Sequence, residues 1–163
     1  METYPPFGDT VDVFLQMSQT FKRMLDSGYA HNDIKGDNVC VREGTHGPEA
    51  VVIDVGNATP VGTVGPYWGT SDVEQYPWLA PELLLHSHPC CEATDVYGVA
   101  LIIQEELAGW EADGVYPTHP SMAALEAWIH GARSGCVDER PGLAPLITVL
   151  ECLRREVHHN IHE

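Results

Sequence analysis

The sequence predicts a mainly α-helical domain that carries one small β-hairpin. Apolar residues recur at helical spacing over about 10–27, 121–132 and 143–153. Segment 93–107 is apolar on nearly every side, which is typical of a helix buried at the centre of a helical domain. Two short apolar runs on either side of a turn cluster at 44–48 predict the hairpin.

The chain is expected to enter the first helix from an irregular segment. Residues 1–9 contain a proline pair and a glycine, and we interpret them as a lead-in. Asp9 or Thr10 can then cap the helix, because both side chains accept hydrogen bonds from free N–H groups of a first turn. We expect the helix to end at Ser27, because Gly28 adopts the left-handed conformation of a helix stop without strain.

The hairpin is expected to lead into a long loop. The two apolar runs lie at 39–41 and 51–53. Residues 54–79 are rich in Gly, Pro, Thr and Ser and show no periodicity, which indicates a loop of the kind that is often functional in compact domains. Residues 157–163 are expected to form a tail after the last helix. No repeat or second domain is visible, so we interpret residues 1–163 as a single domain.

The chain is strongly acidic. It has 24 Asp and Glu residues against 8 Lys and Arg residues, and its formal net charge is −16. A surface this negative repels phosphate backbones and anionic lipids, so we expect no nucleic-acid partner and no membrane partner. A protein substrate or a protein partner is expected instead, and a basic one suits the charge best.

Cysteine usage and the first residues predict a cytoplasmic or nuclear protein. The cysteines number five, an odd count without C-x-x-C spacing, and are expected to be reduced thiols. The first ten residues lack the basic and apolar regions of a signal peptide. The longest apolar run is too short to be a transmembrane segment.

Polar residues that suit phosphate chemistry flank the hairpin. His31, Asp33, Lys35 and Asn38 precede it, and Asp54 follows it. A hairpin brings its two ends together, so Asn38 and Asp54 are expected to face one site. Phosphoryl transfer from ATP needs a carboxylate that orients the attacking hydroxyl, oxygen ligands for Mg²⁺ and a cation near the transferred phosphate. These residue types meet that list.

The segments that carry these residues resemble motifs of the eukaryotic-type protein kinases. H-N-D-I-K-G-D-N at 31–38 resembles the catalytic loop H-R-D-[LI]-K-x-x-N, and D-V-G-N-A at 54–58 resembles the metal motif D-F-G-x-A. A-P-E at 80–82, D-V-Y at 95–97 and R-P at 140–141 resemble three later motifs of the family. The five motifs occur in the order of the family and span nearly the whole chain.

The resemblance implies the C-terminal lobe of a protein kinase. This is a helical bundle around a buried central helix, with a small β-hairpin that carries the catalytic and metal motifs. Lysine at position 35 resembles the pattern of the serine/threonine class. Residues 54–82 would be the activation segment. Nothing before residue 10 of this sequence can supply the Gly-rich loop, lysine and glutamate with which the N-terminal lobe grips ATP. We therefore expect a truncated kinase that is weak or inactive alone, whether Met1 is a true start or the chain is a gene fragment.

The resemblance also assigns roles in the reaction. Asp33 would be the catalytic aspartate, and Lys35 would be a second catalytic residue that approaches the transferred phosphate. The cofactors would be ATP and Mg²⁺. Lys35, Asn38 and Asp54 would bind them, with Asn38 and Asp54 as the metal ligands.

Five further residues would be structural. His31 and Gly56 would be scaffold residues of the two motifs, and Asp95 would hydrogen-bond the catalytic-loop backbone. Glu82 and Arg140 would form a buried ion pair that ties the activation segment to the lobe. The sequence departs from the family at other positions. Asn32 stands where Arg is usual, and Trp78 stands where Tyr is common.

Three functions remain open. The first is a serine/threonine-type protein kinase domain that transfers the γ-phosphate of ATP to protein hydroxyls with Mg²⁺. The second is a non-catalytic, pseudokinase-like binding or scaffold module, which the absent ATP-gripping half favours. The third is a small-molecule phosphotransferase, against which Lys35 and the motifs at 80–82 and 140–141 argue.

Overall fold

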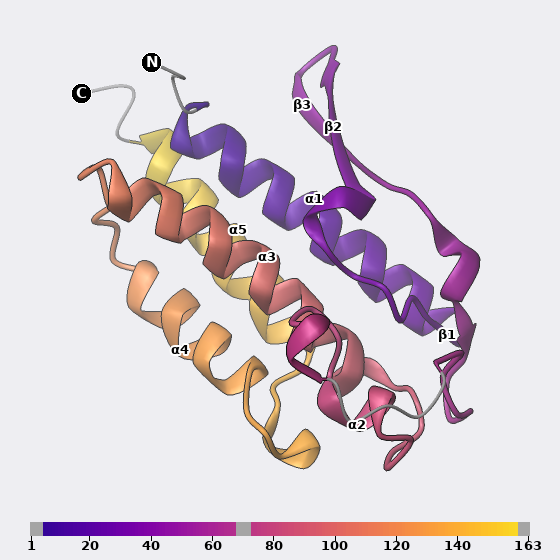
Figure 1. Ribbon diagram of the computed structural model, residues 1–163. Helices are drawn as coiled ribbons and strands as arrows, with labels where there is room; N and C mark the ends of the chain where they lie inside the picture. Colours follow the sequence, from indigo (N-terminus) through magenta and orange to yellow (C-terminus); the bar gives the residue numbers. More distant parts are fainter. Residues whose placement is uncertain (1–4, 68–72, 160–163) are drawn as a thin grey trace.

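The computed structural model describes residues 5–67 and 73–159. In these residues helices form most of the structure (Figure 1): α1 (Phe7–Asp26), α2 (Pro81–Leu84), α3 (Glu92–Ala112), α4 (Met122–Ala132) and α5 (Leu143–His159). The strands form two antiparallel ribbons, in which β2 (Val39–Gly44) pairs with β3 (Gly47–Val52) and β1 (Tyr29–Ala30) pairs with β4 (Thr59–Pro60). The prediction of a mainly helical chain with a small hairpin is confirmed.

The long helices pack around one main apolar core. α1 packs on α5 and on β3, α3 packs on α4, and α4 packs on α5. Figure 1 shows α3 and α5 running through the bundle, with α1 on one side and α4 on the other. The buried side chains of α3 in this core are Val96, Val99, Ala100, Ile103 and Leu107. They belong to the segment whose continuous apolar pattern predicts a buried helix.

The first helix begins earlier than the sequence predicts. Phe7 is its first residue, and Pro6 precedes it with φ −50° and ψ 138°. Asp9 and Thr10 therefore lie inside the first turn, and the prediction that one of them caps the helix is wrong. Proline suits this boundary because its fixed φ is already helical. The first N–H groups of a helix have no acceptor within it, so the N–H that proline lacks costs no hydrogen bond here. Residues 1–4 of the expected lead-in lie outside the described residues.

The hairpin is longer and its turn tighter than predicted. The pairing runs from Val39 opposite Val52 to Gly44 opposite Gly47. Only two residues connect the strands, whereas the sequence predicts a turn over 44–48. Gly47 has a φ of 120°, which only glycine adopts readily, and this lets the chain reverse directly into β3.

A side chain of α1 fixes the hairpin on the bundle. Gln16 Nε2 donates to Pro48 O, and Gln16 Oε1 accepts from Ala50 N–H, each at 2.9 Å. These two bonds hold the main chain of β3 against α1. The second ribbon, β1 with β4, was not predicted from the sequence, because strands of two residues are too short to show alternation.

The later helices also extend beyond the predicted limits. α3 continues to Ala112, past residue 107, and α5 ends at His159. Residues 157–159 of the expected tail are therefore helical, while 160–163 lie outside the described residues. None of the helices described is long and apolar enough to cross a membrane.

Candidate functional site

Three groups surround the carboxylate of Asp33. Asn38 Nδ2 donates to Asp33 Oδ2 at 3.1 Å and to the Asp33 main-chain oxygen at 2.8 Å. Trp78 Nε1–H donates to Oδ1 at 2.8 Å, and Lys35 Nζ lies 3.8 Å from Oδ2. Asp33 is only 9% exposed. These donors replace the water that burial removes from the carboxylate.

Lys35 is held beside Asp33 without a tight ion pair. Its Nζ lies 5.0 Å from the centre of the Trp78 ring, within the range of a cation–π contact. The Lys35 side chain is 31% exposed. The ammonium group can therefore turn toward an anion that approaches from solvent while its stem stays against the indole.

The base of the hairpin brings this loop next to Asp54. Ile53 N–H donates to Asn38 O at 3.0 Å, so the residue before Asp54 is bonded to the end of segment 31–38. Asp54 has a left-handed φ of 58°, and its Oδ1 accepts from Gly56 N–H at 3.4 Å. The Asp54 side chain is exposed, which leaves its oxygens open to a ligand.

The ring of His31 lies between the loop that carries Asp33 and the residue before Asp54. Its ring is buried, Nδ1 accepts from Asp33 N–H at 3.3 Å, and Nε2 lies 3.3 Å from Ile53 O. Burial lowers the pKa of His31, while the bond to Ile53 and the charges of Asp33 and Asp54 act in the opposite direction. His31 thus connects the main chain of Asp33 to that of Ile53, the residue before Asp54.

Asp95 of α3 holds the main chain of the loop at 31–38 through hydrogen bonds. Its Oδ2 accepts from His31 N–H at 2.8 Å and its Oδ1 from Asn32 N–H at 3.0 Å. Burial raises the pKa of Asp95 to about 6, and the two N–H donors act in the opposite direction. Asn32 itself has a left-handed φ of 64°. The buried carboxylate thus holds a backbone conformation that few residues other than glycine adopt.

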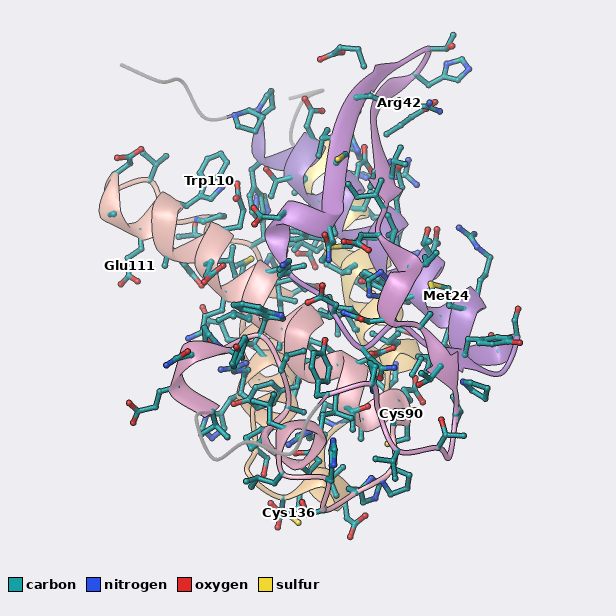
Figure 2. All side chains as sticks on the ribbon, turned by 45° about the vertical axis from the view of Figure 1, so that its right-hand side comes forward. Met24, Arg42, Cys90, Trp110, Glu111 and Cys136 are labelled. Atoms are coloured by element: carbon teal, nitrogen blue, oxygen red, sulfur yellow. The ribbon has the colours of Figure 1, made fainter. Side chains whose placement is uncertain are left out.

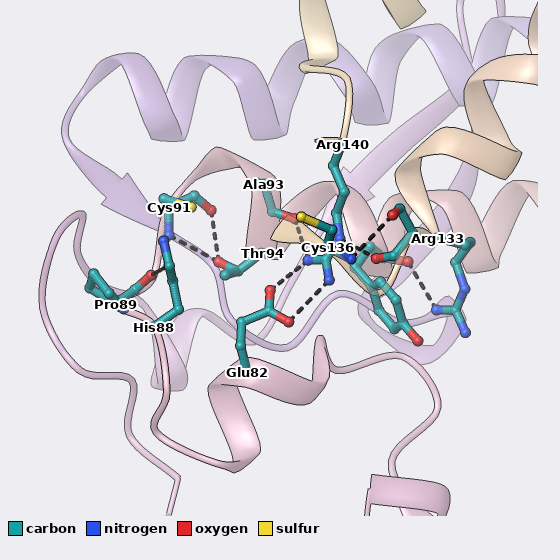
Figure 3. Close-up of polar contacts among 11 residues, drawn as sticks. Glu82, His88, Pro89, Cys91, Ala93, Thr94, Arg133, Cys136 and Arg140 are labelled. Carbon is teal, nitrogen blue, oxygen red and sulfur yellow. Dashed lines mark hydrogen bonds and ion pairs between the residues drawn. The ribbon is translucent and has the colours of Figure 1, made fainter. Parts of the chain in front are cut away.

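A buried ion pair joins α2 to the segment before α5 (Figure 3). Arg140 Nη1 and Nη2 donate to Glu82 Oε1 and Oε2 at 2.5 and 3.0 Å. Arg140 also donates to Ala93 O and Ser134 O, each at 2.9 Å, and its guanidinium lies 4.8 Å from the centre of the Tyr97 ring. The two residues expected to pair are therefore in bidentate contact, and every oxygen of Glu82 has a donor.

The contacts of three residues of the site, Asn32, Tyr67 and Trp78, are not predicted by any local pattern. Trp78 donates to Asp33, and Tyr67 O–H donates to Asn32 O at 2.5 Å. Asn32 Nδ2 in turn donates to Asn57 O at 2.9 Å and to Thr59 Oγ1 at 2.7 Å. These bonds tie segment 31–38 to the chain after Asp54. The partners lie 25 to 45 residues apart, a distance over which local patterns are silent.

The side chains at the base of the hairpin are too few to hold a free metal ion. Among the residues that the structure describes, no three His, Cys, Asp or Glu side chains gather to hold a metal. Mg²⁺ in nucleotide sites needs only one or two side chains, because phosphate oxygens and water complete its coordination. Asn38 commits its NH₂ group to Asp33, which turns its carbonyl oxygen away from that carboxylate. That Asn38 and Asp54 would hold such a complex stays a prediction.

Comparison with known proteins gives a partial match. No family model matches the chain. The protein "Cyclin-dependent kinase F-3" of Oryza sativa subsp. japonica is 34% identical over 91 residues, which are 56% of this chain and 20% of that protein. The similarity is to a kinase. The matched region spans about a fifth of the length of that relative, so the comparison indicates a kinase-related region and nothing about the activity of the whole.

Proposed function

We propose that this chain is the C-terminal lobe of a serine/threonine-type protein kinase and that it retains a site for the phosphates of Mg-ATP. The five motifs in family order and the partial similarity to a cyclin-dependent kinase support the proposal. The observation that carries it is the convergence of Asn38, Trp78 and Lys35 on the carboxylate of Asp33. A structural turn aspartate has no need of a lysine and two side-chain donors.

Each residue of the site has a separate task in this proposal. Asp33 accepts the hydrogen bond of a protein hydroxyl and orients its oxygen for attack, and Lys35 balances negative charge nearby. Asn38 and Asp54 offer oxygen atoms to a divalent cation from the two ends of the hairpin. Mg-ATP, when bound, supplies the transferable phosphoryl group. Asp95 keeps the loop rigid, so that these side chains keep their positions.

Phosphoryl transfer by this chain alone is expected to be slow. Oδ1 of Asp33 already accepts a hydrogen bond from Trp78, and Oδ2 accepts one from Asn38. A substrate hydroxyl must therefore displace the indole or share the carboxylate with it. The exposed position of Asp54 has a second cost, because water competes with a nucleotide for an open site.

Thermal unfolding with Mg-ATP tests the phosphate site directly. The melting temperature of the wild type is expected to rise with Mg-ATP concentration as RT ln(1 + [L]/Kd) predicts. The Asp54→Asn variant should lose most of this shift, whereas Asp138→Asn, at an exposed carboxylate of another region, should keep it. No shift in the wild type at millimolar Mg-ATP, or equal shifts in wild type and Asp54→Asn, would contradict the proposal.

A transfer assay tests the catalytic role. Radiolabelled ATP, Mg²⁺ and a basic protein substrate are incubated with the wild type and with Asp33→Asn. The variant is expected to keep the Mg-ATP thermal shift and to lose incorporation of phosphate, because Asp33 orients the hydroxyl and is not one of the residues proposed to hold Mg-ATP. Equal incorporation by the two proteins would assign the signal to a contaminant and remove Asp33 from the mechanism.

A second candidate function is a non-catalytic binding module. Ile53 and Val55, on either side of Asp54, are 40% and 58% exposed. Apolar side chains exposed beside a polar site are typical of an interaction surface. Absence of the Mg-ATP shift together with saturable binding of a protein partner that Val55→Asp abolishes would favour this function over transfer.

A further inference from the structure

A cavity lies between the start of α1, the hairpin and α3, and Gly36 of the loop at 31–38 also lines it. Its volume is about 430 Å³, which is within the range of sites that hold a side chain or a small ligand. In Figure 2, Trp110 and Glu111 mark the far part of α3 and Arg42 marks the hairpin, and α1 begins between them. The three elements come together only in the folded chain, so the cavity is a tertiary feature.

The floor and walls of this cavity are apolar. Val13 and Phe14 of α1, Val39 and Val41 of β2, and Ile102 of α3 line it. Val41 of β2 is 56% exposed, so part of this apolar lining faces solvent. Covering such side chains with an aliphatic group would remove apolar surface from water, which is favourable by roughly 25 cal/mol per Å².

Three carboxylates surround the apolar floor without partners. Asp9, Glu43 and Glu106 line the cavity, and no Lys, Arg or His of the described chain does so. Among the described residues none of the three carboxylates forms an ion pair, although other acidic side chains of the chain, such as Asp12 and Glu49, do. The negative charge at this rim is therefore available to a cation from outside.

A buried hydroxyl in the same cavity wall also has no partner. Thr10 is 5% exposed, and its Oγ1 makes no hydrogen bond in the part of the chain that the structure describes. Thr10 lines the cavity. This oxygen is enclosed by the protein, so it is not a contact point for a ligand in the open cavity. Apolar floor and anionic rim together describe a ligand that is both aliphatic and cationic.

We infer that this cavity binds a segment of a partner protein in which aliphatic side chains are flanked by arginine or lysine. The aliphatic groups cover Phe14, Val41 and Ile102, and the basic groups pair with Glu43 and Glu106. A second copy of this chain is a poor occupant, because each copy carries a net charge of −16 and the copies repel each other. A nucleotide is a poor occupant for the same reason, since its phosphates would face the carboxylates.

Fluorescence anisotropy with defined peptides tests the inference on the complete chain. The probe is a fluorescein-labelled nonapeptide with two leucines flanked by two arginines on each side. One control peptide has glutamine in place of each arginine, and the other has serine in place of each leucine. Saturable binding of the probe is expected, weakened by added salt because the charge pairs are at the rim. Each control peptide should bind at least about tenfold more weakly.

Matched variants locate the binding. Glu43→Gln with Glu106→Gln should weaken binding of the probe by about fivefold in total, since partly exposed charge pairs each contribute little to affinity. Asp138→Asn with Glu151→Gln removes two exposed charges elsewhere and should leave the affinity unchanged. Thr10→Val should also leave the affinity unchanged, because the enclosed hydroxyl does not reach the ligand.

The outcomes separate this inference from the proposed phosphate site. Asp33→Asn and Asp54→Asn should bind the probe like the wild type, so loss of nucleotide binding leaves the peptide result readable. Equal affinity for the probe and the glutamine peptide, or equal effects of the two double substitutions, would overturn the inference. Displacement of the probe by ATP without Mg²⁺ would also overturn it, because the cavity would then be part of a nucleotide site. Dimerisation of the chain that excludes the probe would do the same.

Discussion

Trp78 Nε1–H donates to Asp33 Oδ1 at 2.8 Å, while the same indole ring lies under the ammonium group of Lys35 at 5.0 Å. One side chain from the segment before α2 thus contacts both residues that the sequence assigns to catalysis. The contact joins positions 45 residues apart. It connects the loop at 31–38 to the segment that leads to α2.

Replacing Trp78 by phenylalanine tests how much this connection contributes to stability. The variant keeps an aromatic ring but loses the N–H, so Asp33 loses one of its donors. We expect the free energy of unfolding to fall by about 1.5 kcal/mol, the value of a hydrogen bond to a charged group. Urea denaturation measures this. In the Asp33→Asn background the same substitution should cost less, because the charged acceptor is already absent.

The control for this prediction is Tyr76→Phe. It removes a hydroxyl from a neighbouring ring that contacts Trp78 edge to face and is 36% exposed. Its effect on stability is expected to stay within about 0.5 kcal/mol. An equal cost of Trp78→Phe in both backgrounds would show that the bond to Asp33 contributes nothing to stability.

The sequence predicts the parts of this structure that have local signals. The apolar pattern of 93–107 predicts a buried α3, and the runs at 39–41 and 51–53 predict β2 and β3, because both patterns depend on residues a few positions apart. The boundaries differ by several residues. At Pro6 the backbone preference of proline decides the helix start, and the side chains of Asp9 and Thr10 do not.

The candidate site is predictable only where motifs supply the long-range information. The motifs place Asp33, Asn38 and Asp54 at the two ends of a hairpin, and the structure brings these ends together through Ile53. Trp78 could not be predicted as a partner of Asp33, because no local pattern relates them. Long-range contacts of this kind depend on the packing of the whole chain, which composition and periodicity do not specify.

Asp95 makes stability depend on pH in a defined direction. Its folded-state pKa is about 6, above the ordinary 3.8, because burial penalises the charged form. The folded protein therefore binds this proton more tightly than the unfolded chain does. The free energy of unfolding should fall as pH rises from about 4 to 6 and then level off.

The Asp95→Asn variant isolates this dependence, because its side chain does not titrate. The stability of the wild type minus that of the variant, measured by urea denaturation, should be larger at pH 4 than at pH 7. The variant should also be less stable at pH 4 by about 1–3 kcal/mol, because its NH₂ group cannot accept from the N–H groups of His31 or Asn32, whereas the hydroxyl oxygen of the protonated acid can. A difference that grows between pH 4 and pH 7 would contradict a raised pKa.

The pair of Glu82 and Arg140 is expected to be important because it is buried. Its side chains are 10% and 0% exposed. Glu82→Ala would leave the guanidinium without a counter-charge and should lower the free energy of unfolding by about 3–5 kcal/mol. Glu49→Ala, which removes the exposed partner of Arg42 in the hairpin, should cost no more than about 1 kcal/mol. Similar costs for both would show that burial does not set the strength of the inner pair.

Gly98 is where α3 passes closest to the loop that carries Asp33. A Cβ at this position would lie 2.5 Å from Ile34 O and 3.1 Å from Trp78 O, both of them main-chain atoms. In an open helix alanine would be more stable than glycine by about 1 kcal/mol. Here we expect Gly98→Ala to lower the free energy of unfolding by about 1–3 kcal/mol, because the loop must move away from α3.

Gly135→Ala, with no atom within 4 Å of the new Cβ, is the control and should stay within about 0.5 kcal/mol of the wild type. Faster hydrogen exchange at the His31 and Asn32 amides, which Asp95 protects, should accompany the loss of stability in Gly98→Ala. Unchanged exchange at these amides would show that the loop does not depend on the close approach of α3.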